Sequence, residues 1–179
     1  MRVLVSVESK HGSTEEIAAA ITAELIAAGL EVDALDPPEV ESLDGYQAVV
    51  LGSALYMGKR MPGIVQIIER HAQALRERDV WLFSSGPIRE PPNLAEDPVG
   101  AALLARIGAR KPRMFTEKLD RGNLSIVERL VSAPEGDFRD WPAIREWARS
   151  IAGELSRKAA RSRPASLLER RPFAAGHRS

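Results

Sequence analysis

The sequence contains no cysteine, few aromatic residues and no long hydrophobic run. The absence of cysteine excludes disulfides, thiolate nucleophiles and thiolate metal sites, and therefore thioredoxin-like and iron–sulfur chemistry. No stretch reaches the length of a membrane-spanning helix, and the first residues lack the pattern of a signal peptide. The three histidines are scattered and show no spacing typical of metal ligands. We therefore expect a cytoplasmic protein with no bound metal.

The sequence also has no net charge, because 25 lysines and arginines balance 25 aspartates and glutamates. Bulk charge therefore gives no reason to expect a nucleic-acid partner. A chain of 179 residues can bury the core of one domain. Because the last residues are rich in arginine, we expect a domain over 1–157 and a basic, flexible tail over 158–179. The tail is either a solvated terminus or an arm that contacts anionic lipid or a partner, which leaves peripheral membrane contact open.

Hydrophobic periodicity predicts five strands that alternate with helices. The strands are expected over 2–7, 31–35, 48–52, 80–84 and 113–115, and the helices over 15–28, 62–75, 99–107 and 143–157. Such alternation is typical of an α/β protein whose parallel sheet has helices on both faces. We expect a doubly wound sheet of strand order 2-1-3-4-5. In such sheets ligands bind beyond the carboxyl ends of the strands, here near strands one and three.

The loop after the first strand has small and hydroxyl-bearing residues where a helix begins. Its residues are Ser9, Lys10, His11, Gly12, Ser13 and Thr14. The unsatisfied N–H groups and partial positive charge of a helix N-terminus suit a phosphate. An alternative is an ordinary helix N-cap at Ser13 or Thr14, followed by the acidic first-turn residues Glu15 and Glu16.

Two further loops are expected at the same edge of the sheet. The loop after the third strand offers Ala54, Leu55, Tyr56, Met57 and Gly58, and the loop after the fourth offers Ser84, Ser85, Gly86 and Pro87. Gly52 and Gly58 would let the backbone lie against a flat ligand, and Tyr56 would add aromatic surface. The alternative is that glycine and proline mark ordinary turns. The coincidence of three such loops favours a binding site.

The first loop resembles the hydroxyl-rich phosphate loop of flavodoxins, T/S-x-T-G-x-T. Over roughly residues 1–153 the chain resembles the flavodoxin-domain family, which includes a menaquinone-dependent protoporphyrinogen dehydrogenase. The other matching segments are 16–18, 52–54, 56–58 and 140–141. This resemblance implies a flavodoxin-like fold, with FMN bound by the three loops. In this sequence His11 occupies a position where many flavodoxins have threonine, and the segment between 119 and 141 is shorter than the dehydrogenase's insertion.

The same resemblance implies an FMN-dependent oxidoreductase, one that oxidises protoporphyrinogen with a quinone acceptor in haem biosynthesis. The alternatives are an FMN-binding electron carrier with a redox partner, and a flavodoxin-like interaction module without a cofactor. A response-regulator receiver is disfavoured because Glu8 and Ser53 occupy the places of its acidic residues.

Three cations are expected in the two loops beside the flavin ring: Lys59, Arg60 and Arg89. They would stabilise reduced, anionic flavin and could bind the carboxylates of a porphyrinogen-like substrate. Alternatively, they are solvated surface charges. No side chain is identified as a general base, so no catalytic residue is predicted. The sequence gives neither the redox partner nor the oligomeric state.

Overall fold

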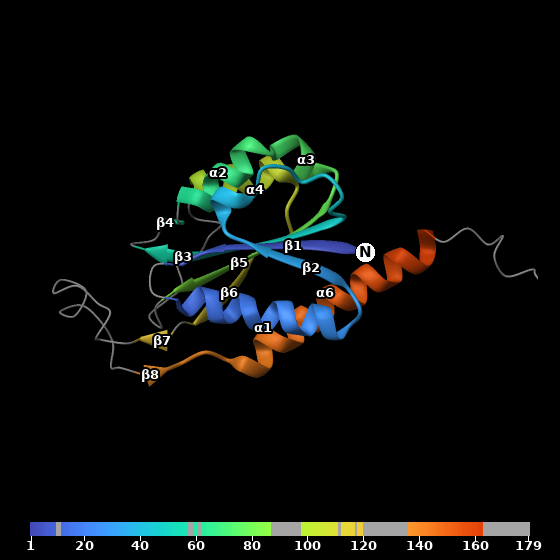
Figure 1. Cartoon of the computed structure of the whole chain (residues 1–179). Helices are drawn as coiled ribbons and strands as arrows, with labels where there is room; N and C mark the ends of the chain where they lie inside the picture. Colours follow the sequence, from blue (N-terminus) through green and yellow to red (C-terminus); the bar gives the residue numbers. More distant parts are fainter. Residues whose placement is uncertain are drawn as a thin grey trace, which may run out of the picture.

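A parallel sheet in the order β2-β1-β3-β5-β6 forms the centre of the molecule (Figure 1). Its strands are β1 (Arg2–Glu8), β2 (Glu31–Leu35), β3 (Ala48–Tyr56), β5 (Asp79–Gly86) and β6 (Arg113–Thr116). This computed structural model describes residues 1–9, 12–56, 59–60, 62–86, 98–110, 112–116, 118–119 and 136–162. When only the parallel strands are counted, the order is 2-1-3-4-5, which confirms the predicted flavodoxin-like fold.

Helices cover both faces of the sheet (Figure 1). One face carries α1 (Ser13–Ala27) and α6 (Trp141–Ser162), and the other carries α2 (Pro62–Arg70), α3 (Ala72–Arg76) and α4 (Pro98–Ile107). A short 3₁₀ turn, η1 (Pro37–Glu39), follows β2. The carboxyl ends of β1, β3 and β5 lie together at the left of Figure 1, as the parallel arrangement requires.

The sheet separates two hydrophobic cores, because successive side chains of a strand point to opposite faces. In β1, Val3 and Val5 contribute to one core and Leu4 to the other. The first core contains Ile17, Ile21 and Leu25 of α1 together with Ile144, Ile151 and Leu155 of α6. The second contains Ile64, Ile67 and Ile68 of α2 together with Leu75 and Ile107. The apolar residues of these helices therefore face the sheet.

Several elements differ from their predicted bounds. The helix expected over 62–75 is interrupted at His71, whose φ of −111° and ψ of 20° are not helical, and whose ring nitrogen Nε2 lies 3.3 Å from the Val40 carbonyl oxygen. The third strand continues to Tyr56 and pairs with β4 (Lys59–Arg60). A second sheet of β7 (Lys118–Leu119) and β8 (Gly136–Asp137) was not predicted.

The last helix, expected to end at 157, continues to Ser162. Its extension is anchored to the amino end of β5, where Lys158 Nζ lies 2.6 Å from Asp79 Oδ2. Residues 158–162 are therefore helical, and the rest of the predicted tail, 163–179, lies outside the described residues. In the described part of the chain, no helix combines the length and the hydrophobicity needed to cross a membrane.

Candidate functional site

The turn between β1 and α1 is closed by a side chain that was predicted to bind a phosphate. Gly12 N donates to Ser9 Oγ over 3.0 Å, and Glu16 N donates to the Gly12 carbonyl over 3.0 Å. Gly12 is the N-cap of α1, has a φ of 81° and makes no side-chain cap. The alternative that Ser13 or Thr14 is the N-cap is therefore wrong, because both lie inside the helix. A helix N-terminus that has no side-chain cap is a position that suits an anionic ligand.

Thr14 and Ser85 connect the first predicted loop to the third. Their hydroxyl oxygens lie 2.8 Å apart, and both side chains are buried. Two hydroxyls carry two hydrogens, and their mutual hydrogen bond uses only one. The mutual hydrogen bond therefore leaves one hydroxyl hydrogen of the pair for another acceptor. The structure thus brings these two predicted residues together.

The predicted site residues of β5 point to different faces of the sheet. Ser85 lies on the α1 face, whereas Ser84 points to the opposite face and is fully buried. Ser84 Oγ has no hydrogen-bond partner in the described structure. The backbone of Gly86 pairs with β6 opposite Thr116, at the end of the strand. On this geometry Ser85, and not Ser84, is on the face of the β1–α1 turn.

The second predicted loop is a hairpin rather than an irregular turn. Strand β3 continues past the parallel sheet, and β4 pairs with it antiparallel, with Leu55 opposite Arg60 and Tyr56 opposite Lys59. Ala54 is buried and lies opposite Ser85 in the sheet. The hairpin therefore begins beside the Thr14–Ser85 pair. The predicted residues Lys10, His11, Met57, Gly58, Pro87 and Arg89 lie outside the described residues.

Gly52 was predicted to allow close approach of a flat ligand, but its neighbours are core side chains. A Cβ added at Gly52 would lie 2.5 Å from Phe83 Cε1 and 2.6 Å from Val7 Cγ1. The Phe83 ring in turn packs edge-on against Trp147, with ring centroids 5.9 Å apart. The missing side chain of Gly52 thus makes room for the core, and the prediction for this residue is wrong.

Glu8, at the end of β1, contacts the start of α2. Its Oε2 accepts a hydrogen bond of 2.6 Å from Gly63 N, in the first turn of that helix. A side chain at Gly63 would approach this oxygen to 2.7 Å, so glycine is needed for the contact. No sequence pattern indicates this pairing, because the two residues are 55 positions apart.

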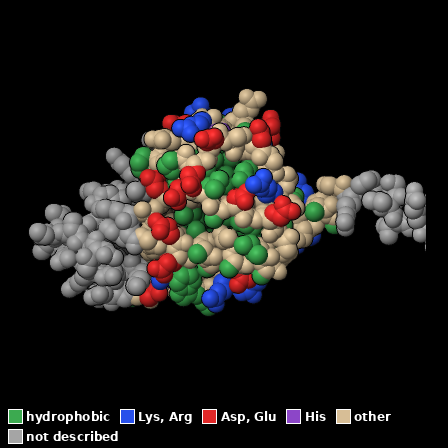
Figure 2. Space-filling model, viewed as in Figure 1, with side chains coloured by type: hydrophobic (Ala, Val, Ile, Leu, Met, Phe, Trp, Pro, Cys, Tyr) green, Lys and Arg blue, Asp and Glu red, His purple; other side chains and the backbone are tan. Residues whose placement is uncertain are grey.

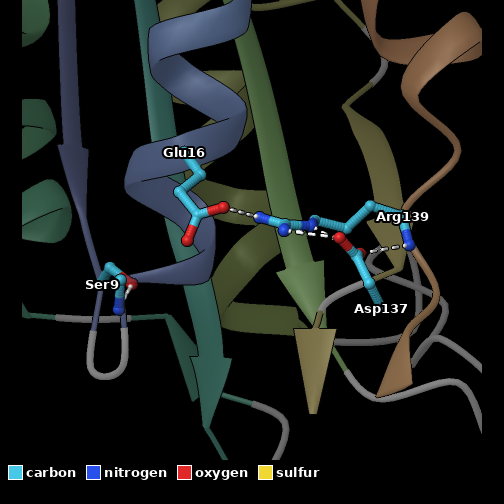
Figure 3. Close-up of polar contacts among 5 residues, drawn as sticks. Ser9, Glu16, Asp137 and Arg139 are labelled. Atoms are coloured by element: carbon cyan, nitrogen blue, oxygen red, sulfur yellow. Dashed lines mark hydrogen bonds and ion pairs between the residues drawn. The ribbon is translucent and has the colours of Figure 1, made fainter. Parts of the chain in front are cut away.

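A buried arginine links the first turn of α1 to the segment before α6 (Figure 3). Arg139 Nη1 lies 2.7 Å from Glu16 Oε2, and Nη2 and Nε lie 2.7 and 2.8 Å from the two carboxylate oxygens of Asp137. The guanidinium also lies over the Trp141 ring, 4.3 Å from its centroid. Sequence reasoning missed this cluster, because an Asp-x-Arg pair has no distinctive spacing.

The Arg139–Asp137 contact predicts an acid-dependent contribution to stability. Hydrogen bonds from Arg139 lower the pKa of Asp137 to about 2, below the value of about 3.9 expected in an unfolded chain. A lowered folded-state pKa stabilises the fold above about pH 4, and this contribution is lost as the pH falls from about 4 to about 2. We expect Asp137→Asn to lower the free energy of unfolding by about 1 kcal/mol at pH 7, because the carboxylate is partly solvated.

This expectation can be measured by urea unfolding of wild type and Asp137→Asn between pH 7 and pH 2. The difference should vanish at the acid end. Asp44→Asn is the control, since Asp44 is exposed and 4.0 Å from its nearest cation, Arg78, and this variant should match wild type at every pH. A difference that stays constant over the whole range would contradict the assignment.

The described part of the chain contains no group of three or more acidic or histidine side chains that could hold a metal ion. Among the residues that are described, the predicted site therefore consists of backbone N–H groups and hydroxyls at the carboxyl ends of β1, β3 and β5. A helix N-terminus without a side-chain cap, a buried hydroxyl pair and a hairpin beside them suit an anionic group attached to a larger ligand.

Comparison with known proteins supports this interpretation of the fold. A family model described as "Flavodoxin domain" matches residues 4–132. No curated protein matches the sequence. Among solved structures, a flavodoxin from the domain Archaea has a TM-score of 0.60 at 13% identity and covers 87% of this chain and 99% of its own. Flavodoxin 1 from Bacillus cereus has a TM-score of 0.57 at 15% identity, with coverages of 88% and 98%.

A larger protein also contains a similar domain. The rubredoxin oxygen:oxidoreductase from the anaerobe Desulfovibrio gigas has a TM-score of 0.64 at 15% identity, and the match covers 89% of this chain. The chain spans only 37% of that protein. At these identities the structural similarities establish the fold alone.

Proposed function

The chain belongs to the flavodoxin domain family, and from this premise we propose that it is an FMN-binding redox protein. FMN is the cofactor that this family binds, and it combines a phosphate with a flat ring system. The observation that carries the proposal is the position of the N-terminus of α1, which follows directly after β1, begins after Gly12 with its positive φ and has no side-chain cap. A helix N-terminus at the carboxyl end of this strand lies where the fold places a ligand.

The residues present fit the phosphate of FMN. The first-turn N–H groups of α1 would bind its oxygens, and the Thr14–Ser85 pair would donate its spare hydrogen. The β3–β4 hairpin would lie along the ring, with Tyr56 as the proposed aromatic contact, and Gly86 and Pro87 would be contacts from the third segment. Ser84 would not contact the phosphate, because it points to the face opposite α1. Bound FMN would supply the electron-accepting chemistry, while the protein positions it and adjusts its potential.

A more specific proposal for the activity is the oxidation of a porphyrinogen-like substrate with a quinone acceptor. It rests on the sequence resemblance and on the cations Lys59, Arg60 and Arg89, of which the first two form β4. A cation beside the ring would favour reduced flavin and hold substrate carboxylates. Against this, acidic side chains are prominent toward the carboxyl-end side of the surface in Figure 2, which would partly offset such cations.

An electron carrier is the second candidate. The extent of the structural match favours this candidate, since the match to the archaeal flavodoxin spans 99% of that protein. A carrier needs only the flavin and a redox partner, and no substrate pocket. Among the described residues, the cavity of about 480 Å³ lined by Asp79, Trp81 and Arg110 lies at the amino end of β5, away from the predicted site.

Titration with FMN tests the proposal. We expect quenching of flavin fluorescence and a shifted absorbance spectrum, with reversible reduction of the bound flavin under anaerobic conditions. Turnover of protoporphyrinogen with a quinone, compared with free FMN, then separates the two candidates. FMN binding without turnover above the free-flavin control would support the electron carrier. The absence of FMN binding would support only the interaction module.

Contact of the basic tail with anionic lipid is part of the proposal as well. The test is flotation with anionic liposomes, with the full chain compared to a chain that ends at Ser162. Ending at 157 would remove the Lys158–Asp79 contact and disturb the domain itself. Equal flotation of the two chains would remove the lipid-binding arm from the proposal.

A further inference from the structure

Arg139 is almost completely buried, although it is surrounded by partly exposed acids. Its side chain is 3% exposed, whereas those of Glu16 and Asp137 are 56% and 39% exposed. Burying a guanidinium is costly unless its donors are satisfied. Here, among the described residues, three of its five N–H donors form hydrogen bonds, two with Asp137 on one side and one with Glu16 on the other. The arginine therefore has one well-defined position, and it holds the Glu16 carboxylate in place.

Glu16 lies in the turn that forms the candidate phosphate site. Its N–H bonds to the Gly12 carbonyl, so its backbone is one helical turn from the N-cap, and a turn rises only about 5.4 Å. This rise separates the backbones of Gly12 and Glu16, and it is shorter than the screening length of about 8 Å at physiological salt. An uncompensated carboxylate here would repel a phosphate dianion bound at the same end of α1.

Figure 3 shows how the arginine is placed relative to this turn. The Arg139 guanidinium reaches across from the segment before α6 and contacts Glu16 on the side of α1, above the loop that carries Ser9. The three charged side chains sum to one negative charge with Arg139 present and to two without it. Arg139 thus both directs the Glu16 carboxylate and compensates its charge.

We propose that Arg139 is a positioning residue that makes the acidic first turn of α1 compatible with a phosphate and so favours FMN over uncharged riboflavin. This inference rests on the proposed function. If Arg139 had a purely structural role, it would link β8 to α1, and its loss would lower the affinities for FMN and for riboflavin equally. The ratio of the two affinities separates these roles.

The test compares FMN and riboflavin binding to wild type and to Arg139→Met. We expect the ratio of FMN affinity to riboflavin affinity to fall by about fivefold at low ionic strength. Because the effect is electrostatic, the loss should shrink at roughly 0.5 M salt, where screening acts over about 4 Å. Far-ultraviolet circular dichroism and a thermal melt report whether the variant is folded.

Arg149→Met is the matched control. Arg149, in α6, pairs with Glu24 of α1 at 3.3 Å, so it also binds a glutamate of α1, but about two turns further from the site. Its removal should leave the affinity ratio unchanged. The double variant Glu16→Gln with Arg139→Met should recover most of the lost ratio, because the uncompensated charge is removed along with the arginine.

Each outcome supports or overturns the inference. An unchanged ratio in folded Arg139→Met, a loss insensitive to salt, or no recovery in the double variant would overturn it while FMN binding stands. If Arg139→Met does not fold, the variant Glu16→Gln is the deciding test, because it keeps the Arg139–Asp137 contact. A ratio of FMN affinity to riboflavin affinity that is raised about twofold supports the inference, and an unchanged ratio overturns it. Failure of wild type to bind FMN would overturn this inference together with the proposed function.

Discussion

Replacing Gly52 by alanine is expected to lower the free energy of unfolding by about 3 kcal/mol, the upper end of the usual cost of overpacking a core. The added methyl group would lie 2.5 Å from Phe83 Cε1 and 2.6 Å from Val7 Cγ1, distances that Cβ contacts do not reach without movement. Phe83 cannot turn away easily, because its ring also packs against Phe115 and Trp147. Urea unfolding followed by circular dichroism measures the loss.

Gly153→Ala is the matched control for this substitution. Gly153 lies in α6, and a Cβ there would meet only the flexible end of Arg157, at 3.4 Å. Alanine is the better helix former, so this variant should gain about 0.5–1 kcal/mol. If Gly52→Ala proved as stable as wild type, the close packing of Phe83 across β3 would be incorrect.

The second large effect is expected on cofactor binding. Gly12→Ala should weaken FMN binding by about tenfold or more, equivalent to one or two hydrogen bonds to a charged group. With a φ of 81°, alanine is strained at this position, and it relieves the strain by moving the turn closed by Ser9. The first-turn N–H groups of α1 then no longer point at one acceptor. Fluorescence titration with FMN measures the change.

The other end of the same helix supplies the control. Gly29 has a φ of 83°, and among the described residues no atom lies within 4 Å of a Cβ added at Gly12 or at Gly29. Backbone strain should therefore cost both alanine variants about 1 kcal/mol of stability. Only Gly12→Ala should lose FMN affinity. Equal binding by the two variants would show that the β1–α1 turn does not hold the phosphate.

The sequence predicted the sheet order well, because burial of both faces leaves a strong pattern. The run 48–52 is uniformly apolar, and it proved to be the start of the central strand β3. The helix that contains Ile17, Ile21 and Leu25 was found by the same reasoning, and it ends shortly before Gly29, which has a positive φ. Patterns that depend on local spacing and burial can thus be read directly from the residues.

The site was harder to predict, because its contacts join distant segments. Thr14 was expected to face a phosphate, but its hydroxyl is also bound to Ser85, 71 residues away. Arg139 and Glu16 are 123 residues apart, so nothing local indicates their pairing. The prediction for Gly52 failed for a related reason. From the sequence alone, a glycine that makes room for a ligand cannot be distinguished from one that makes room for a phenylalanine ring.

The contact between Glu8 and Gly63 has a consequence for where an anion can bind. Two helices begin near the end of β1, and each presents partial positive charge there. One of them, α2, already receives an anion from the chain itself, the Glu8 carboxylate. The other, α1, has no side-chain cap. The Glu8 carboxylate therefore already occupies the N-terminus of α2, and we expect a phosphate to bind at the N-terminus of α1 instead.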